Sequence, residues 1–207
     1  VSDAGVFVVE DTQMSGEVRV HTGHFESGAF EIGDAVTLHV DAARRNLTRR
    51  NHSATHLLHG ALRHILGEHV QQRGSAVGPD RLRFDFSHFG PVTPAEIRTV
   101  EAYVNSRIVD NPAVSTDIVT KDEAIERGAI AFFGDKYGDA VRMLTIADSI
   151  ELCGGTHVAA TGDIGLFRIV SEGALASGVR RIEGVTGLRA LEWVHEREEL
   201  LQSVADT

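Results

Sequence analysis

The sequence of 207 residues contains a single cysteine, Cys153. One cysteine cannot form a disulfide within the chain, so we expect a reducing compartment, the cytoplasm, and consider metal binding or thiol reactivity for this residue. No run approaches the roughly 18 apolar residues of a membrane-spanning helix, and residues 1–20 lack the pattern of a signal peptide. The sequence therefore predicts a globular protein outside the membrane. Because the chain begins with Val1 rather than methionine, we also expect a piece of a longer protein.

Two common catalytic motifs are missing as well. The chain has only two lysines, Lys121 and Lys136, and neither follows the GxxxxG pattern of a phosphate-binding P-loop. No GxSxG motif of a serine hydrolase is present. The sequence therefore excludes these two ways of building a catalytic site.

Net positive charge is also missing, since the formal net charge is −10. This balance argues against a protein whose whole surface binds nucleic acid by neutralising phosphates. Two local basic patches remain, which are either solvated surface arginines or contacts for an anionic partner. They are "RRNLTRR", with Arg44, Arg45, Arg49 and Arg50, and the pair Arg180 and Arg181.

Hydrophobic patterns predict an α+β protein. Short antiparallel strands are expected at 5–11, 16–21 and 34–40, which together form a small β module, part of a barrel. Helical periodicity begins near Asn46 and continues to about Leu66. Further strands are expected at 69–77, 81–89, 113–120, 140–148, 165–175 and 179–187, with helices at 93–111, 121–128 and from 188 onward.

Two of these elements carry specific expectations. In the strand at 81–89, Leu82, Phe84 and Phe86 share one face, which predicts a sheet with one face against a core. The helix at 93–111 opens with Thr93 as N-cap, Pro94 at the first position and Glu96 three residues after the cap, the pattern of a capping box.

The helix near Asn46 carries "HSATHLLH". At 100° per residue His52, Thr55, His56 and His59 fall within about 100° of one another, and the apolar residues centre on the opposite side. A polar stripe facing solvent is one interpretation. The other is a metal site, because two histidines at i and i+4 present their imidazole nitrogens to one point.

The segment "CGGTH" supplies a second pair, Cys153 and His157, about a hundred residues later. By itself it is typical of a tight turn with a buried thiol. Together the two pairs predict a zinc site, since zinc accepts imidazole and thiolate in tetrahedral geometry. Gly154 and Gly155 permit backbone angles that other residues resist, and we expect them to leave room for a substrate beside the ion.

A histidine-rich set with one thiolate and adjacent glycines favours a catalytic rather than a structural zinc. The metalloprotease helix needs Glu directly after its first histidine, and here that position is Ser53. Peptide hydrolysis is therefore disfavoured, and an activated ester is a better match to a site with no obvious carboxylate base. Zinc can polarise a carbonyl, activate water or hold the substrate, and the sequence does not choose among these roles.

The residues that surround both pairs resemble the editing domain of bacterial alanyl-tRNA synthetases almost word for word, from about Arg49 to Gly187. The resemblance is carried by "RNHSATHLLHGALRHILGEHVQQRGSAVGPDRLRFDFSHFG", "AFFGDKYGD", "ELCGGTHVAATGDIG" and "SEGALASGVRRIEGVTG". It implies a two-layer α/β fold with a curved antiparallel sheet around the long histidine helix. It also divides the chain into a partial β-barrel module at 1–44, an editing domain at 45–187 and, at 188–207, the start of a helical connection to a C-terminal domain.

The activity implied by the resemblance is hydrolysis of the ester that joins serine or glycine to alanine tRNA. In the family pattern the Zn²⁺ ligands match His52, His56, Cys153 and His157. Thr55 matches a threonine placed to recognise the serine side chain, Gln72 matches a glutamine of the same pocket, and with Cys153 they are the expected catalytic residues. Arg49, Arg50, Arg180 and Arg181 are expected to guide the tRNA acceptor end.

The resemblance further implies that the full-length enzyme ligates alanine to its tRNA with ATP and oligomerises through a C-terminal domain outside this sequence. Three alternatives remain at this point. One is a free-standing AlaX-type trans-editing hydrolase. The second is a zinc-stabilised tRNA-binding module without activity, and the third is a general metallohydrolase of small esters.

Overall fold

The computed structural model describes residues 1–130, 138 and 140–206. Most of the "AFFGDKYGD" motif at 131–139, including Lys136, lies outside the described residues. The chain divides into two compact units, residues 1–42 and 43–207. No helix among the described residues is long and apolar enough to cross a membrane.

The first unit is built on an antiparallel hairpin of β1 (Gly5–Ser15) and β2 (Val18–Gly28). The strand expected at 34–40 is wrong, because this segment forms no regular strand. Its apolar side chains Val36, Leu38 and Val40 are 47%, 68% and 62% exposed. An alternating pattern predicts a strand only where a core covers the apolar face. No described residue of this unit covers the apolar side chains of this segment. No closed barrel forms among the residues described.

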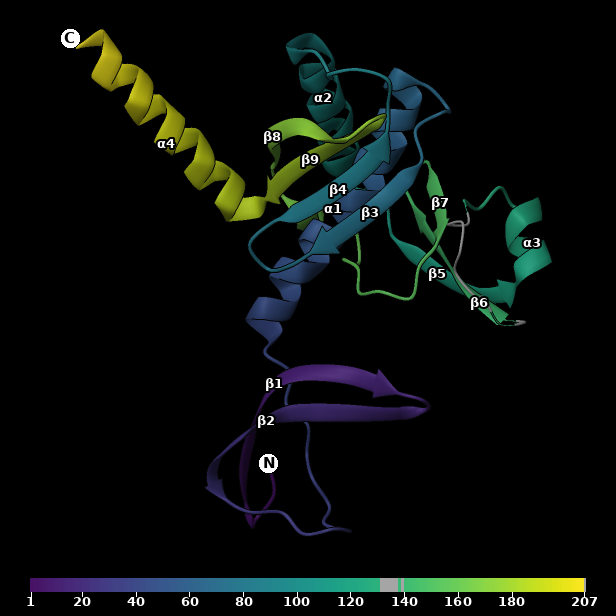
Figure 1. Cartoon of the computed structure of the whole chain (residues 1–207), viewed down its shortest axis with the longest axis vertical. Helices are drawn as coiled ribbons and strands as arrows, with labels where there is room; N and C mark the ends of the chain where they lie inside the picture. The colour runs from purple at the N-terminus through teal and green to yellow at the C-terminus, as the bar shows by residue number, and fades with distance from the viewer. Residues whose placement is uncertain (131–137, 139, 207) are drawn as a thin grey trace. The chain divides into compact units, whose positions relative to one another are not determined.

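The second unit confirms the α+β class and contains two antiparallel sheets where the resemblance implied one (Figure 1). One sheet has the order β3 (Gln72–Val77), β4 (Leu82–Ser87), β9 (Val179–Thr186) and β8 (Phe167–Ala176), and the other has the order β5 (Ser115–Thr120), β6 (Ala140–Ile146) and β7 (Ser149–Leu152). The helices are α1 (Ala42–Leu66), α2 (Pro94–Asp110), α3 (Lys121–Glu126), a 3₁₀ turn η1 (Thr161–Ile164) and α4 (Gly187–Ala205).

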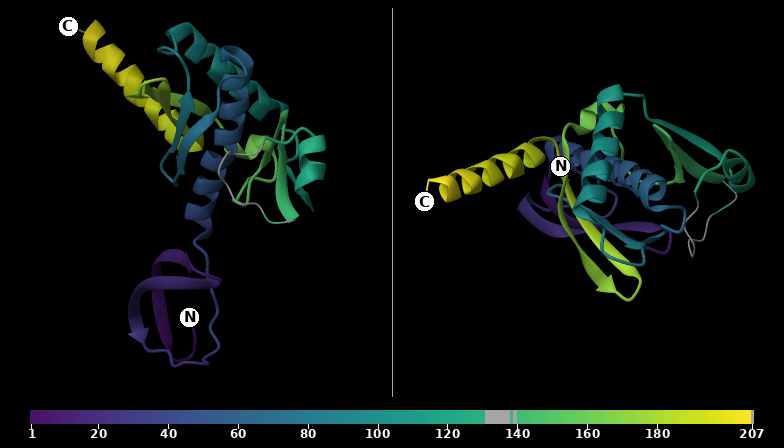
Figure 2. Two further views of the ribbon diagram at one scale, coloured as in Figure 1. Left: turned by 45° about the vertical axis from the view of Figure 1, so that its right-hand side comes forward. Right: turned by 90° about the horizontal axis from the view of Figure 1, so that it is seen from above.

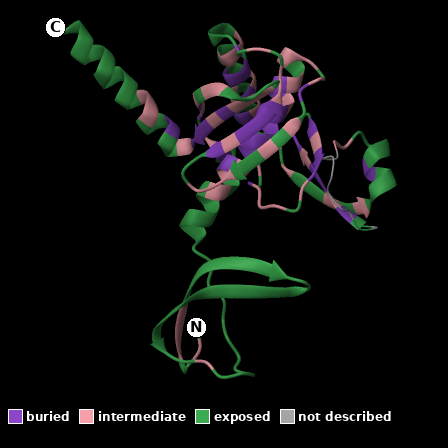
Figure 3. Ribbon diagram, in the orientation of Figure 1, coloured by how far each residue is buried: buried purple, intermediate pink, exposed green. Residues whose placement is uncertain are grey.

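Helix α1 is the centre of this unit because it contacts both sheets. The ring of His59 lies 5.3 Å from that of Phe84 on β4, while His56 and His59 both contact Glu151 on β7. The predicted core face of β4 is confirmed, since Leu82, Phe84 and Phe86 are fully buried. Figure 3 shows the buried residues gathered on α1 and β4. The middle of α1 is therefore covered on two sides.

The capping box of α2 is also confirmed. The Glu96 amide donates to the Thr93 hydroxyl at 3.2 Å, and the Thr93 amide donates to the Glu96 carboxylate at 2.8 Å. The helix ends at Asp110, and its C-cap Asn111 adopts the left-handed conformation with φ 51°. Local sequence chemistry thus fixes both ends of α2.

Helix α4 extends away from the four-stranded sheet (Figure 2). It confirms the predicted helical tail, and along it Leu188, Leu201 and Val204 are at least 70% exposed.

Candidate metal centre

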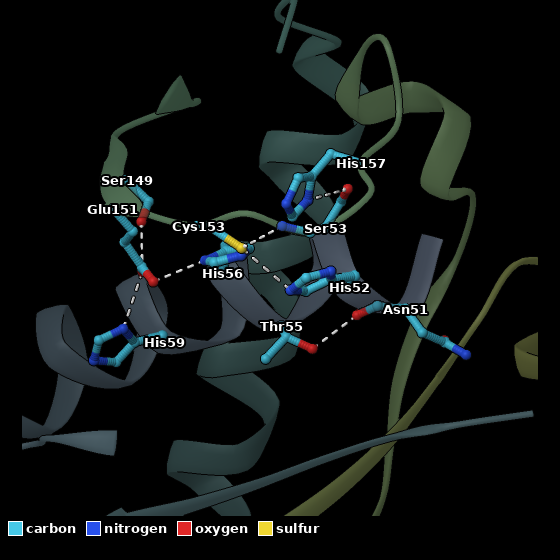
Figure 4. A network of polar contacts seen from close by, with 11 residues as sticks. Asn51, His52, Ser53, Thr55, His56, His59, Ser149, Glu151, Cys153 and His157 are labelled. Atoms are coloured by element: carbon cyan, nitrogen blue, oxygen red, sulfur yellow. Dashed lines mark hydrogen bonds and ion pairs between the residues drawn. The ribbon is translucent and has the colours of Figure 1, made fainter. Parts of the chain in front are cut away.

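The four side chains predicted to hold a metal lie together in the structure. His52 and His56 come from α1, while Cys153 and His157 come from the loop that follows β7 (Figure 4). Their potential ligand atoms all lie within 4.8 Å of one another, and the Cys153 Sγ is 3.5 Å from the His52 Nε2. The fold therefore joins two motifs that are 101 residues apart.

The loop after β7 is held by Arg142 on β6. The Cys153 amide donates to the Arg142 carbonyl at 3.0 Å. The Arg142 guanidinium in turn donates to the carbonyls of Cys153 and Gly155, at 3.0 and 2.7 Å. These three bonds fix the turn that carries the thiol.

The two glycines of this loop have different roles. Neither lies in the left-handed region, so the freedom of backbone angles that glycine permits is not used there. A Cβ at Gly155 would overlap the His52 ring, reaching 2.6 Å from Nδ1, whereas a Cβ at Gly154 would meet nothing within 4 Å. Gly155 therefore lets the loop pack against a predicted ligand, and Gly154 leaves open space beside Cys153, as expected.

Each of two histidines in the cluster has an outer polar partner. The Nδ1 of His56 is 2.7 Å from the carboxylate of Glu151, which also contacts the Nδ1 of His59 at 3.0 Å. The Ser53 hydroxyl lies 3.3 Å from the Nδ1 of His157 and accepts the Val158 amide at 3.1 Å. The histidine stripe of α1 does not face solvent, since His56 is 5% and His59 2% exposed.

The electrostatics of the cluster favour a thiolate. Burial opposes ionisation of Cys153, but the surrounding imidazoles of His157, His52 and His56 lower the pKa of its thiol to about 3. Burial would lower the pKa of His56, yet the charge of Glu151 raises it to about 10. Burial likewise opposes ionisation of Glu151, and the charge of His56 with the hydrogen bonds of both histidines holds its pKa well below the usual value. Burial lowers the pKa of His157.

These groups fit a zinc ion. The Nε2 atoms of His56 and His157 are buried and have no hydrogen-bond partner among the described residues. Because Nδ1 of His56 is bonded to a carboxylate, the neutral form of the ring carries its lone pair on Nε2, where a metal can bind. One thiolate and three imidazoles are ligands that zinc accepts, and their potential ligand atoms lie within 4.8 Å of one another.

The other two predicted catalytic residues, Thr55 and Gln72, lie on α1 and β3. Thr55 is 4% exposed, precedes His56 on α1 and donates its hydroxyl to the Asn51 carbonyl at 2.8 Å. Gln72 is half-buried at the start of β3, opposite Phe86. No hydrogen bond within the described part of the chain joins Gln72 to the cluster.

Two arginines of the first basic patch, Arg49 and Arg50, lie near the loop of the cluster. Arg49 donates to the Thr156 hydroxyl at 3.0 Å, and Arg50 donates to the Asp163 carbonyl at 2.9 Å. Both line a cavity of about 280 Å³ with Asn46, Val158, Ala159 and Asp163.

Both arginines of the second basic patch, Arg180 and Arg181, form ion pairs. Arg180 binds Glu172 through two hydrogen bonds of 2.6 and 2.7 Å, and Arg181 binds Asp85 through two of 2.6 and 2.9 Å. The Arg180 side chain is only 13% exposed. A larger cavity of about 780 Å³, lined by Arg181 and by Trp193 of α4, contains none of the four predicted ligands.

Sequence reasoning missed three residues of the site, namely Glu151, Ser53 and Arg142. Glu151 had a signal, because it stands two residues before Cys153 at the end of a strand, where alternate residues share a face. Ser53 was noted only as the residue in place of a catalytic glutamate. Nothing in the sequence pointed to Arg142, whose contacts depend on how β6 pairs with β7.

Comparison with known proteins gives two findings. Residues 141–183 match the family model described as the threonyl and alanyl tRNA synthetase second additional domain. Over all 207 residues the chain is 55% identical to the alanine–tRNA ligase of Albidiferax ferrireducens, and the aligned part is 24% of that protein. The chain is 54% identical to the corresponding ligases of Bordetella avium, over 99% of the chain, and Halorhodospira halophila, over 97%. It thus spans about a quarter of the length of the curated relatives it matches.

Proposed function

Because this chain is related over its whole length to a segment of the alanine–tRNA ligase family, we propose that it hydrolyses the ester of mischarged seryl-tRNA(Ala) and glycyl-tRNA(Ala) at a zinc site. The observation that carries the proposal is the convergence of His52, His56, Cys153 and His157, with two buried imidazole nitrogens that find no hydrogen-bond partner in the described part of the chain. When bound, zinc would supply Lewis-acid chemistry at the ester carbonyl.

Such an activity is needed because an amino-acid pocket shaped to bind alanine has limited selectivity. A hydrophobic pocket rejects an isostere with one added hydroxyl, or a residue one methyl smaller, only weakly. A second site that removes the wrong products raises the selectivity of the whole enzyme.

Thr55 supports the serine part of the proposal. Its hydroxyl hydrogen is engaged with the Asn51 carbonyl, so its oxygen retains lone pairs that accept a hydrogen bond. A serine hydroxyl has a hydrogen to donate and an alanine methyl has none. Gln72 is proposed to line the same pocket, and the open space beside Gly154 to admit the aminoacylated end. Arg49 and Arg50 are proposed to guide the acceptor end. Arg180 and Arg181 are proposed for the same role with less support, because the guanidinium group of each already binds a carboxylate.

The name of the relatives and the family resemblance extend the proposal. The full-length protein would ligate alanine to its tRNA with ATP, reside in the cytoplasm and oligomerise through a domain outside this chain. One observation favours a second function, a structural zinc module without activity: four protein ligands make a closed site, and closed sites are typical of structural zinc.

The test is a deacylation assay of the 207-residue chain with seryl-, glycyl- and alanyl-tRNA(Ala), beside Cys153→Ala, with zinc content measured for both proteins. We expect the parent to release serine and glycine and to spare alanine. Cys153→Ala should lose zinc and activity together, because it removes the only thiolate of the set. Stoichiometric zinc with no release of serine would instead establish the structural module.

A further inference from the structure

We propose that Glu151 is a positioning residue of the metal centre, whose carboxylate holds the His56 ring so that Nε2 faces the other three ligands. The inference rests on the zinc site of the proposed function. It assigns a role to a residue that neither the motifs nor the resemblance singled out.

The Glu151 carboxylate is divided between three donors. Oε2 contacts the His56 Nδ1 at 2.7 Å, while Oε1 contacts the His59 Nδ1 at 3.0 Å and accepts the Ser149 hydroxyl at 2.9 Å. The side chains of Glu151 and His59 are 2% exposed and that of His56 is 6% exposed. The network is buried, so its hydrogen bonds are stronger than they would be in water.

The chemistry of a carboxylate decides which tautomer His56 adopts. An ionised carboxylate only accepts hydrogen bonds, so the Nδ1 of His56 has to carry the hydrogen. The lone pair of the neutral ring is then on Nε2, which is buried without a hydrogen-bond partner among the described residues. Metal-binding histidines are commonly oriented in this way by a carboxylate behind the ring.

The same network explains why "HSATHLLH" has a third histidine. His59 follows His56 by one turn of α1 and binds the other oxygen of Glu151. With Ser149 it occupies Oε1 and leaves Oε2 to His56. His59 is therefore a support of the carboxylate, although it lies on the same face of the helix as the two predicted ligands.

The experiment measures zinc affinity of the 207-residue chain by competition with a chelator, together with the absorption spectrum of the cobalt-substituted protein, which reports tetrahedral geometry. Glu151→Gln keeps the size of the side chain and removes its charge. We expect this variant to fold, to bind zinc about 10–100-fold more weakly, as is usual when an outer partner of a ligand is lost, and to change the cobalt spectrum.

Glu101→Gln is the matched control. Glu101 is a buried glutamate of α2, 5% exposed, that binds the Ile169 amide at 2.7 Å and Arg168 at 2.8 Å. It also loses a buried charge, but it has no hydrogen bond to any of the four ligands. We expect its zinc affinity to stay within about twofold of the parent, whatever it does to stability.

A folded Glu151→Gln whose zinc affinity and cobalt spectrum equal those of the parent overturns the proposal. If Glu151→Gln does not fold, Glu151→Asp decides, because it keeps the buried charge and withdraws the carboxylate from His56. Weaker zinc binding with an altered spectrum then supports the proposal, and unchanged binding overturns it. No tRNA enters the experiment, so a chain without deacylase activity still gives a result, and a parent that binds no zinc ends the proposal.

Discussion

At the scale of single residues, the contact between Gly155 and His52 predicts which substitution the loop tolerates. Gly155→Ala puts a methyl group into the His52 ring, so either the ring or the loop has to move, at a cost of about 1–3 kcal/mol for an overpacked position. We expect zinc affinity to fall by about tenfold or more, measured by chelator competition.

Gly154→Ala is the control for this prediction, since its new methyl group meets no atom within 4 Å. Neither glycine lies in the left-handed region that disfavours alanine. The two variants therefore differ in what the methyl group meets. Equal zinc affinities for the two would contradict the steric role of Gly155.

The four ligands were predictable from the sequence because two pairs with metal-binding spacing occur in one chain with one cysteine. Their outer partners were harder to predict, because Glu151 had only the alternation of its strand as a signal and the contacts of Arg142 depend on how β6 pairs with β7. The packing of Gly155 against His52 was not predicted. A glycine is required at this position because the His52 ring leaves no space for a Cβ. A single sequence does not show which side chain will pack against a given loop residue.

At the scale of elements, the contact of α2 with the turn between β6 and β7 predicts a dependence of stability on pH. Arg107 of α2 donates to both oxygens of Asp148 at 3.0 Å, and these hydrogen bonds lower the pKa of that carboxyl below its usual value. Since the folded pKa is depressed, the contact stabilises the fold above the unfolded pKa of about 4 and is lost as pH falls through the folded pKa.

The measurement is urea unfolding of the parent and Asp148→Asn between pH 6 and pH 3. The parent should be the more stable protein at pH 6, and the difference should shrink toward pH 3. Asp110→Asn serves as control, because Asp110 approaches the same arginine only at 3.8 Å and is largely exposed. A difference that stays constant over this range would exclude the proposed linkage.

Most elements could be predicted because their signals are local. Thr93, Pro94 and Glu96 mark the start of α2, and the alternation of Leu82, Phe84 and Phe86 marks β4. The failure at 34–40 and the division into two sheets have one cause in common. Strand pairing depends on partners distant in sequence, and an alternating pattern does not specify which edge or which core will receive it.

At the scale of the whole molecule, a net charge of −10 has to coexist with a proposed anionic substrate. If Arg49 and Arg50 contact phosphates, each contact releases counterions, and kcat/KM for deacylation falls with salt concentration. Arg49→Gln and Arg50→Gln should each reduce the slope of log kcat/KM against log salt by about 0.7–0.9. Arg189→Gln, which removes a cation paired with Glu192 and Glu196 on α4, should leave the slope unchanged. Equal slopes for all of these proteins would remove the arginines of α1 from the tRNA interface.

The distance in sequence between His52 and Cys153 gives the proposed ion a second effect. Joining two points 101 residues apart costs an unfolded chain on the order of 4 kcal/mol in loop entropy, so the full ligand set exists only in the folded chain. A ligand that binds the folded state alone stabilises it, by about 2.7 kcal/mol at a free concentration of 100 times its Kd. Zinc would thus act as a reversible cross-link between α1 and the loop after β7. A chelator would lower the melting temperature of the unit formed by residues 43–207, and the free zinc concentration would determine how well the protein resists thermal unfolding.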